Sequence, residues 1–418
     1  MRKFAIIGFG CAGYNGAKSL REHAPNVVID VFDPSRRSPF NPMLSTYHAA
    51  GKLPYDAVFP FGSLEEICRA LDLNYFSENV LEVTADRTIR TESDLYRNYD
   101  GILLATGADA MVPGSLRCSG NRWFTMRTLD DALALRQHLD TNQVRSAAVV
   151  GGSMVGIKVA ELLHSEGVNV TIVDAASHLF PLAAYESTAR FIQRQLENKG
   201  LGFRFDAKVT AIDEDGIAFA DGSALQADLV CLCIGTRAGT RSFRNSSVQI
   251  GHAVVVNSHM ETSVPGIYAA GDCCEGINLQ TGKTAVIGLW ANAAMQGACA
   301  GANMAGDHAD CPGNILHNIT RFFDMDFISL GDITLPGCKH LFDCPEFFVS
   351  LVMDGNTLQS VNVVGNYRVS GILKHHLVKQ LTGGASTTFT PAQRGLLERN
   401  GLPREFIQLI GGSPNDRA

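Results

Sequence analysis

The feature that most constrains the fold is a glycine motif close to the N-terminus. Three glycines there have the spacing GxGxxG: Gly8, Gly10 and Gly13. The apolar residues 4–7 predict a short buried strand directly before the motif, and a helical pattern at about 14–23 follows it. A second predicted strand, 27–32, ends in Asp33, 20 residues after the last glycine. Strand, glycine turn, helix, strand and acid in this order predict a dinucleotide-binding βαβ unit.

Each position of the motif has a physical role in that interpretation. Gly8 makes the tight turn, and Gly10 lets the backbone approach a pyrophosphate. Gly13 lets the helix lie close to the strand, so that the helix N-terminus faces the phosphate charge. The Asp33 carboxylate can accept a hydrogen bond from a ribose hydroxyl. A GxGxxG motif alone is a weak signal, but in this setting it predicts a nucleotide site strongly.

A second copy of the motif lies about 143 residues further along the chain. Its glycine positions hold Gly151, Ser153 and Gly156. Predicted strands at 147–150 and 170–173 flank a helix that ends near Glu166, and Asp174 ends the second strand. Ser153 departs from the motif, but its small side chain still leaves room beside phosphates. Two copies predict two nucleotide sites rather than one.

The acid of the second copy indicates which nicotinamide dinucleotide it accepts. Asp174 favours a free ribose 2′-hydroxyl, and residues 175–177 offer no arginine for a 2′-phosphate. We therefore expect NAD(H) rather than NADP(H).

Charge and hydropathy exclude several classes of protein. A net charge of −7 and a pI near 5.9 leave no electrostatic footprint for nucleic acid. The apolar run that begins at Phe4 is too short for a signal-peptide core or a membrane span, so we expect a soluble cytoplasmic protein without membrane contact. The histidines lack metal-ligand spacing with cysteines or acids, so no metal site is expected. Cys231 and Cys233 fall in an apolar strand pattern and are predicted to be inert core thiols.

Shorter motifs between and after the two copies follow a known order. Thr106 and Gly107 end one predicted strand, Gly235 ends another, and the run 262–272 closes on Gly271-Asp272. Together with the glycine motifs they resemble the pyridine nucleotide-disulfide oxidoreductase superfamily over essentially the whole chain. The likeness is greatest to the branch of NADH oxidases, coenzyme A-disulfide reductases, and ferredoxin or rubredoxin reductases.

The resemblance implies an α/β fold with two Rossmann-like dinucleotide-binding domains and a C-terminal α+β domain of the dimerisation type. The implied FAD-binding domain covers 1–113 and 248–312, the NAD-binding domain covers 114–247, and the C-terminal interface domain covers 313–418. The first glycine motif would bind FAD and the second NAD(H), and the chain would form a homodimer.

The resemblance also implies roles for particular residues in the FAD site. The aspartate that corresponds to Asp272 hydrogen-bonds the ribityl chain of FAD. An Ala/Gly-rich helical pattern from about 284 to 304 would lie beneath the flavin ring. Within it Trp290 could stack near the flavin or belong to the core. Arg36 could lie along the adenine or the phosphates, or be an exposed loop arginine.

Three departures from the family pattern affect the chemistry. Disulfide-reducing members carry a redox cysteine soon after the first βαβ unit, but this chain has no cysteine between Cys11 and Cys68. A thiol relay from flavin to substrate is therefore not expected. Lys158 stands where the family usually has glutamate, and we expect its ammonium near flavin N5, the alternative being a solvated helix lysine. Met154 replaces an aromatic residue that admits nicotinamide, and could be the same gate or ordinary packing.

Three functions remain open from the sequence. The first is an NADH-dependent flavoenzyme that passes hydride from NADH to FAD and electrons to a redox protein or small molecule. The second is an NADH oxidase, or a disulfide reductase with an atypical cysteine. The third is a FAD-binding protein that assists a partner without catalysis. One sequence does not name the terminal acceptor, because fold likeness does not settle function.

Overall fold

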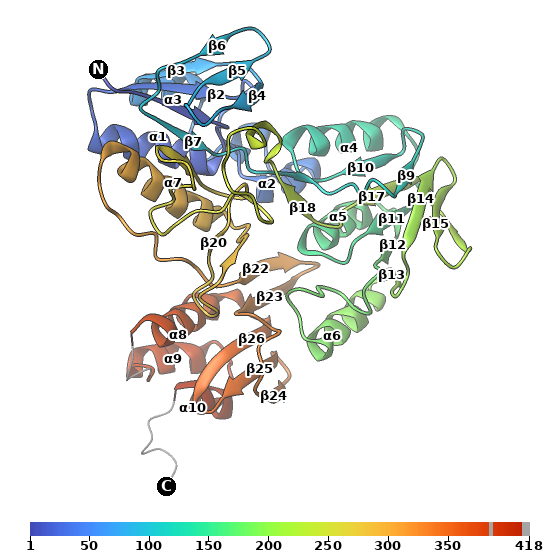
Figure 1. The fold of residues 1–418 in the computed structure, drawn as a ribbon. Helices are drawn as coiled ribbons and strands as arrows, with labels where there is room; N and C mark the ends of the chain where they lie inside the picture. The colour runs from blue at the N-terminus through green and yellow to red at the C-terminus, as the bar shows by residue number, and fades with distance from the viewer. Residues whose placement is uncertain (384–387, 412–418) are drawn as a thin grey trace. The chain divides into compact units, whose positions relative to one another are not determined.

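The computed structural model describes residues 1–383 and 388–411, and the chain divides into two compact units. The first unit contains 1–109, 127–129 and 236–314, and the second contains 110–126, 130–235 and the described residues from 315 onward. Each unit is built on a five-stranded parallel sheet, and the second also carries a C-terminal sheet (Figure 1). The predicted fold class, two Rossmann-like parts and a C-terminal sheet domain, is confirmed. The three-domain bounds stay a prediction.

The parallel sheet of the first unit has the strand order β19-β7-β1-β2-β3. Its strands are β1 (Lys3–Ile7), β2 (Val28–Phe32), β3 (Leu73–Phe76), β7 (Gly101–Leu104) and β19 (Ile267–Ala269). The central strands are buried along almost their whole length, because both faces of the sheet are covered. This burial explains why they read as continuous apolar runs in the sequence.

The remaining elements of the first unit are helices and short antiparallel pairs. The helices are α1 (Cys11–His23), α2 (Pro42–Ala49), α3 (Leu64–Leu71), α7 (Trp290–Ala305) and the 3-10 turns η1 (Tyr55–Val58) and η2 (Arg241–Phe243). The strands are β4 (Val80–Val83), β5 (Ile89–Thr91), β6 (Leu95–Tyr96), β8 (Ala108–Ala110), β18 (Thr236–Ala238), β20 (Gly276–Ile277) and β21 (Thr284–Ala285). The helix expected from about 284 begins only at Trp290, because residues 284 and 285 pair with β20 instead.

Small residues let α1 and α7 approach closely. A Cβ atom on Gly297 would lie 2.2 Å from the carbonyl oxygen of Ala12, and one on Gly301 would lie 2.3 Å from that of Gly16. The two helices run side by side in Figure 1. Side chains larger than hydrogen at these positions would push α7 away from the helix that carries the first glycine motif.

The parallel sheet of the second unit has the order β10-β17-β11-β12-β13. Its strands are β10 (Trp123–Thr125), β11 (Ser146–Val150), β12 (Asn169–Val173), β13 (Gly202–Arg204) and β17 (Leu229–Leu232). Its helices are α4 (Leu129–Thr141), α5 (Met154–Ser165) and α6 (Glu186–Glu197). A second sheet contains β9 (Arg117–Cys118), β14 (Val209–Asp213), β15 (Gly216–Phe219) and β16 (Ala224–Gln226).

The C-terminal part of the second unit is an antiparallel sheet with the order β22-β23-β26-β25-β24. Its strands are β22 (His317–Phe322), β23 (Met325–Leu330), β24 (Cys338–Asp343), β25 (Phe348–Asp354) and β26 (Thr357–Gly365). The 3-10 turn η3 (Tyr367–Val369) and the helices α8 (Ser370–Thr382), α9 (Pro391–Arg399) and α10 (Arg404–Gly411) follow.

Buried polar contacts join α6 to this C-terminal sheet. The hydroxyls of Thr188 and Ser350 are hydrogen-bonded, and so are those of Tyr185 and Ser360. The backbone N–H of Tyr185 donates to Oδ1 of Asn362 at 2.8 Å. Because these buried groups satisfy one another, the contact surface is specific as well as apolar.

Candidate functional site: two matching glycine loops

The first glycine loop connects β1 to α1 with almost no free space around two of its glycines. Gly8 has φ +90°, and a Cβ there would lie 2.4 Å from the carbonyl oxygen of Ala105. A Cβ on Gly13 would lie 2.1 Å from the carbonyl oxygen of Gly8. Gly10 is different, since a Cβ there would have no heavy atom within 4 Å. The loop therefore has no room for a side chain at Gly8 or Gly13, but it has open space around Gly10.

The open side of Gly10 is the N-terminus of α1. Gly10 is the N-cap residue, no side chain caps the helix, and its first turn carries no acid. Backbone N–H groups of the first turn and the helix dipole together favour an anion in such a place. The residues present therefore fit a pyrophosphate, as the sequence predicts for FAD.

Hydrogen bonds from nearby backbone N–H groups orient the Asp33 side chain. Its Oδ2 accepts a hydrogen bond from the Phe9 backbone N–H at 2.7 Å, and its Oδ1 accepts one from that of Ser35 at 2.9 Å. The Tyr75 hydroxyl donates to the Asp33 carbonyl at 3.0 Å, and burial together with the Asp33 charge raises the pKa of Tyr75. A carboxylate can accept up to about four hydrogen bonds, so capacity for ribose hydroxyls remains.

Arg36 follows in an exposed loop with φ +55°. Its Nε donates to the Ser77 hydroxyl at 2.7 Å, which holds the side chain beside β3. A role along FAD stays a prediction for this residue.

Two further motifs end neighbouring strands of the same sheet. Thr106 and Gly107 follow β7, and Gly271 and Asp272 follow β19. Because β19, β7 and β1 are parallel neighbours, their carboxyl ends share the edge where the Gly8 loop begins. Nucleotides bind at this edge in doubly wound α/β folds. Four of the segments predicted for the first site thus meet at this edge: the Gly8 loop, Asp33, Thr106-Gly107 and Gly271-Asp272.

At these strand ends, side chains form hydrogen bonds with backbone groups. The Thr106 hydroxyl donates to the Gly239 carbonyl at 2.7 Å, and Gly107 adopts φ +67°. Gly271 has φ +81°, and its N–H donates to Oε1 of Gln296 in α7 at 2.9 Å. Both turns are consequently fixed by partners distant in sequence.

Arg127 is a site residue that the sequence motifs did not reveal. Its Nη2 lies 2.7 Å from Oδ2 of Asp272, and its Nε donates to the Ala108 carbonyl at 2.8 Å. The two side chains are 23% and 18% exposed, so the pair is largely shielded from solvent. Arg127 therefore fixes the carboxylate that is predicted to meet the ribityl chain. Its position two residues after β10 is the only sequence signal it offers.

Trp290 is the first residue of α7 and lies in an aromatic stack. Its ring is stacked on Phe61 at 5.8 Å and 15°, and Phe61 is stacked on Tyr14 of α1 at 4.0 Å and 19°. The Trp290 carbonyl accepts a hydrogen bond from the Cys11 thiol at 3.4 Å. The ring therefore packs against the first-unit core, and contact with FAD stays a prediction.

The second glycine loop repeats the geometry of the first. Gly151 has φ +112°, and a Cβ there would lie 2.4 Å from the Cys233 carbonyl oxygen. A Cβ on Gly156 would lie 2.0 Å from the Gly151 carbonyl oxygen. Ser153 is the N-cap of α5: its hydroxyl accepts from the Gly156 N–H at 3.1 Å and donates to the Cys233 carbonyl at 2.9 Å. The serine thus ties the loop to the neighbouring strand end, where glycine would leave it loose.

Asp174, the acid of the second loop, accepts two backbone hydrogen bonds, as Asp33 does in the first loop. Asp174 Oδ2 accepts from the Gly152 N–H at 2.6 Å, and its Oδ1 accepts from that of Ala176 at 2.8 Å. Gly235, after β17, has φ +117° and open space around its Cβ position, and its carbonyl accepts from the Met111 N–H at 2.9 Å. The two acids therefore have the same relation to their glycine loops.

Lys158 and Met154 both lie on α5. The Lys158 side chain is only 6% exposed; its ammonium pairs with Glu161 at 3.2 Å and donates to the Arg321 carbonyl in β22. The alternative of a solvated surface lysine is therefore wrong. Met154 is the first residue of the helix and is half-buried. The expected roles of both residues in catalysis stay predictions.

Two classes of feature are absent from the residues that the structure describes. Within 1–383 and 388–411, no three or more His, Cys, Asp or Glu side chains are grouped so as to hold a metal ion. In the same part of the chain, no helix combines the length and apolar character needed to cross a membrane.

This chain belongs to the pyridine nucleotide-disulphide oxidoreductase family, whose pattern matches residues 2–297. It is thus an oxidoreductase of a flavoprotein family, as the motif order predicts. An NADH oxidase from Methanocaldococcus jannaschii is 26% identical over 322 residues, covering 73% of this chain and 70% of the relative. A rubredoxin-NAD(+) reductase from Pseudomonas putida is 27% identical over 361 residues, covering 83% and 89%. Among solved structures, a water-forming NADH oxidase from Lactobacillus brevis bound to NADH has a TM-score of 0.84 at 20% identity, covering 94% and 95%, and shows the shared fold.

Proposed function

We propose that this protein is a FAD-dependent NADH oxidoreductase, which takes a hydride from NADH onto FAD and passes the electrons to a redox protein or a small molecule. The observation that carries the proposal is the duplicated loop geometry. Phe9 N–H binds Asp33 and Gly152 N–H binds Asp174, in each case from the residue after the first glycine. Two loops built alike support two bound dinucleotides.

The first loop is the proposed FAD site. The N-terminus of α1 beside Gly10 would hold the pyrophosphate, Asp33 the adenosine ribose, and Asp272 the ribityl chain. FAD bound there supplies the hydride acceptor and the means to release electrons to a second substrate. Arg127 keeps the Asp272 carboxylate in place. The residues of the protein bind and orient the FAD.

The second loop is the proposed NAD(H) site. Asp174 is held by two backbone N–H groups, so its remaining lone pairs are available to the hydroxyls of the adenosine ribose. Residues 175–177, Ala-Ala-Ser, provide no cation for a 2′-phosphate, which supports NADH over NADPH. We also propose that Met154, at the start of α5, gates the nicotinamide.

The absence of cysteine between Cys11 and Cys68 supports an acceptor that takes electrons from the flavin directly. A redox protein is proposed because one relative is a rubredoxin reductase. Dioxygen is the second candidate, because another relative is an NADH oxidase. A homodimer formed through the C-terminal domain and a cytoplasmic location complete the proposal.

The test is anaerobic mixing of the FAD-loaded protein with NADH and, separately, with NADPH, followed by flavin absorbance. Rapid bleaching by NADH alone is the expected result. Absence of bleaching by either nucleotide would contradict the proposal and favour a partner-assisting, non-catalytic role. Thiol titration after NADH treatment distinguishes a disulfide reductase, which would gain titratable thiols.

Lys158 is proposed to favour the negative charge that hydride transfer adds to the flavin. If so, Lys158→Met lowers the rate of NADH-dependent bleaching by about 100-fold, the usual effect of removing one electrostatic donor. Stopped-flow absorbance measures this rate. The same change also removes one ion-pair partner of the largely buried Glu161, so the variant is expected to unfold at a lower temperature.

A double variant separates these two effects. Lys158→Met with Glu161→Gln removes both charges of the ion pair, so thermal stability should rise above that of Lys158→Met while the bleaching rate stays low. If bleaching returns to the wild-type rate together with stability, Lys158 serves only to tie α5 to β22.

A further inference from the structure

The C-terminal antiparallel sheet ends in a strand that has a neighbour on one side only. β24 is the last strand in the order β22-β23-β26-β25-β24, so within the described residues no strand lies beyond it (Figure 1). A hairpin joins β24 to β25. At its start, the N–H groups of Cys344 and Phe347 each donate to the other residue's carbonyl, at 2.8 and 3.3 Å. This mutual pair fixes which peptide groups of β24 face β25.

The peptide groups on the open side of β24 can be assigned from this pair. Hydrogen-bonded and non-hydrogen-bonded pairs alternate along an antiparallel ladder, and the register between β24 and β25 has no bulge. Counting back from Cys344, the even-numbered residues of β24 therefore bond to β25. The N–H and carbonyl groups of Lys339, Leu341 and Asp343 face the open side. An open edge of this kind is a template for another strand.

The side chains of β24 suit pairing with a second copy of the same strand. In an antiparallel pair centred on Leu341, the two copies of Leu341 lie opposite each other, and Lys339 of each copy lies opposite Asp343 of the other. The Leu341 side chain is 54% exposed, so pairing would remove apolar surface from water. A lysine on an edge strand usually opposes association, but here the carboxylate opposite it supplies the complementary charge.

The same register brings together the cysteines near the two ends of β24. Cys338 is exposed, Cys344 is partly buried, and both are free thiols. With Leu341 at the centre, Cys338 of one copy lies opposite Cys344 of the other, in a non-hydrogen-bonded pair. The Cα atoms of such a pair are about 4.5 Å apart, a distance that a disulfide can span. Within one copy the two cysteines lie along an extended strand, roughly 20 Å apart, so they cannot be joined.

We propose that β24 is the contact between two copies of this chain, which pair antiparallel about Leu341 and so form one continuous sheet. The inference rests on the homodimer of the proposed function and names the strand that forms it. The three outward-facing residues of each copy give about six hydrogen bonds across the contact, two for each pair. The exposed leucine, the opposite charges and the cysteines all meet in one register, which a strand of unrelated sequence would not reproduce.

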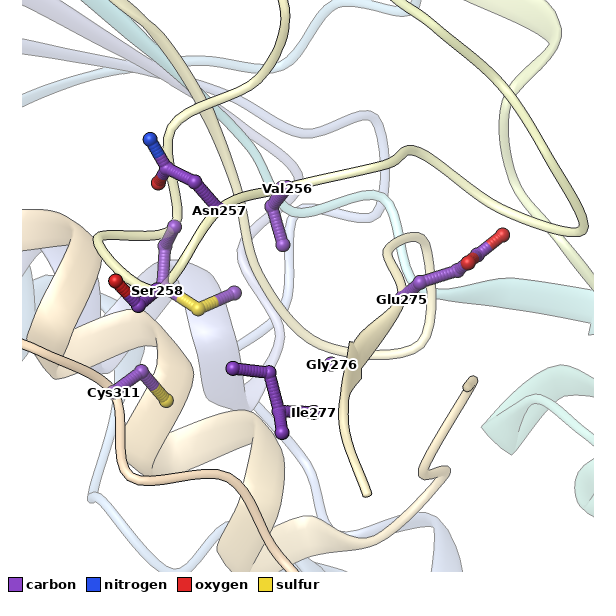
Figure 2. Close-up of a pocket in the computed structure, with 8 residues that line it drawn as sticks. Val256, Asn257, Ser258, Glu275, Gly276, Ile277 and Cys311 are labelled. Atoms are coloured by element: carbon purple, nitrogen blue, oxygen red, sulfur yellow. The ribbon is translucent and has the colours of Figure 1, made fainter. Parts of the chain in front are cut away.

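The pocket shown in Figure 2 is a less suitable place for a partner. It is lined by residues of the first unit, among them Ser258, Glu275 and Cys311, and has room for about one water molecule. The Glu275 carboxylate already accepts hydrogen bonds from the His252 N–H at 2.9 Å and the Thr284 hydroxyl at 2.7 Å. The β24 edge, by contrast, offers unused backbone groups in a row.

The first test measures the assembly state of the full-length, FAD-loaded protein by sedimentation velocity. We expect a dimer, and we expect Leu341→Lys to raise its dissociation constant by about tenfold or more, because two ammonium groups would then face each other. Leu341 is exposed, so this variant should unfold at nearly the wild-type temperature. Ile319→Lys is the matched control and should stay dimeric, because Ile319 is 39% exposed on β22, the opposite edge strand of the same sheet.

The second test addresses the register. Lys339→Asp would place like charges opposite each other and should weaken the dimer by about tenfold. Adding Asp343→Lys exchanges the two charges and should restore the wild-type affinity, a recovery that a folding defect would not show. Diamide, which takes two electrons and two protons from a pair of thiols, should produce a Cys338–Cys344 link between copies. Peptide mass spectrometry identifies this link.

The possible results separate the contact from the dimer itself. A monomer at every concentration contradicts both the homodimer and the β24 contact. A dimer that Leu341→Lys leaves intact overturns only the β24 contact, and so does a dimer that Ile319→Lys alone dissociates. If Leu341→Lys dissociates the dimer, but the charge exchange restores nothing and no Cys338–Cys344 link forms, the register about Leu341 is wrong. Bleaching of FAD by NADH tests the catalytic proposal independently of these results.

Discussion

Replacing Gly10 with glutamate is expected to weaken FAD binding by about 100-fold or more while leaving the protein folded. A side chain at Gly10 meets no heavy atom within 4 Å, and the residue has φ −83°, which any amino acid adopts. The glutamate would fit the free protein but would project into the space proposed for the pyrophosphate. Like charges brought together cost several kcal/mol, so FAD affinity should fall by about 100-fold or more. Flavin content after purification and titration of the apoprotein with FAD measure the loss.

Gly371→Glu is the matched control for this change. Gly371 lies in the first turn of α8, where a Cβ also has no neighbour within 4 Å, and α8 carries no glycine motif. This variant should retain FAD, and both variants should unfold at nearly the wild-type temperature. If titration shows that Gly10→Glu binds FAD as tightly as the wild type, the first glycine loop is not the flavin site.

The second large effect is expected at the end of β12. Asp174→Ala combined with Ala175→Arg should reverse the nucleotide preference. The change removes a carboxylate that would repel a 2′-phosphate and supplies a guanidinium that can bind it bidentately. Together these effects should raise the ratio of NADPH to NADH in the rate of flavin bleaching by about 1,000-fold, equivalent to roughly 4 kcal/mol. Anaerobic stopped-flow absorbance with each nucleotide gives the ratio.

Asp174→Asn removes the negative charge of Asp174 but keeps part of its hydrogen bonding to the glycine turn. Its Oδ1 can still accept one of the hydrogen bonds now donated by Gly152 and Ala176, so the loop loses less than in Asp174→Ala. We expect the asparagine variant to weaken NADH discrimination without gaining strong NADPH binding. An unchanged NADH preference in both variants would show that Asp174 does not select the nucleotide.

The parts of the fold that the sequence predicted are those fixed by local pattern. The strands at 4–7, 27–32, 147–150 and 170–173 all correspond to strands of the structure within a residue or so. Each glycine loop belongs to a βαβ unit. The strands, helix and acid of that unit lie within about 30 consecutive residues, so the sequence pattern of the unit is uninterrupted. For the same reason, the sequence alone assigns Asp33 and Asp174 to their loops.

The unpredicted parts depend on contacts between distant segments. Arg127 and Asp272 are 145 residues apart, and no spacing rule relates them. The sequence predicts only that Lys158 lies on a helix, whereas its burial depends on β22, whose carbonyl at Arg321 lies 163 residues further on. Ser153 could be recognised as small, but its second function, binding the Cys233 carbonyl, required the neighbouring strand end. Tertiary packing, rather than local preference, decides such features.

The contact between α6 and the C-terminal sheet has a consequence for how the polypeptide is made. The ribosome releases α6, with its buried face of Thr188, Ala189, Ile192 and Leu196, well before it releases β25 and β26, which cover that face. Domains generally fold as units during synthesis, from the N-terminus onward. The second unit therefore keeps an uncovered helix face until β25 and β26 have been synthesised. A chain that ends after the first unit's last segment would expose this face of α6, and chaperones and proteases would bind it.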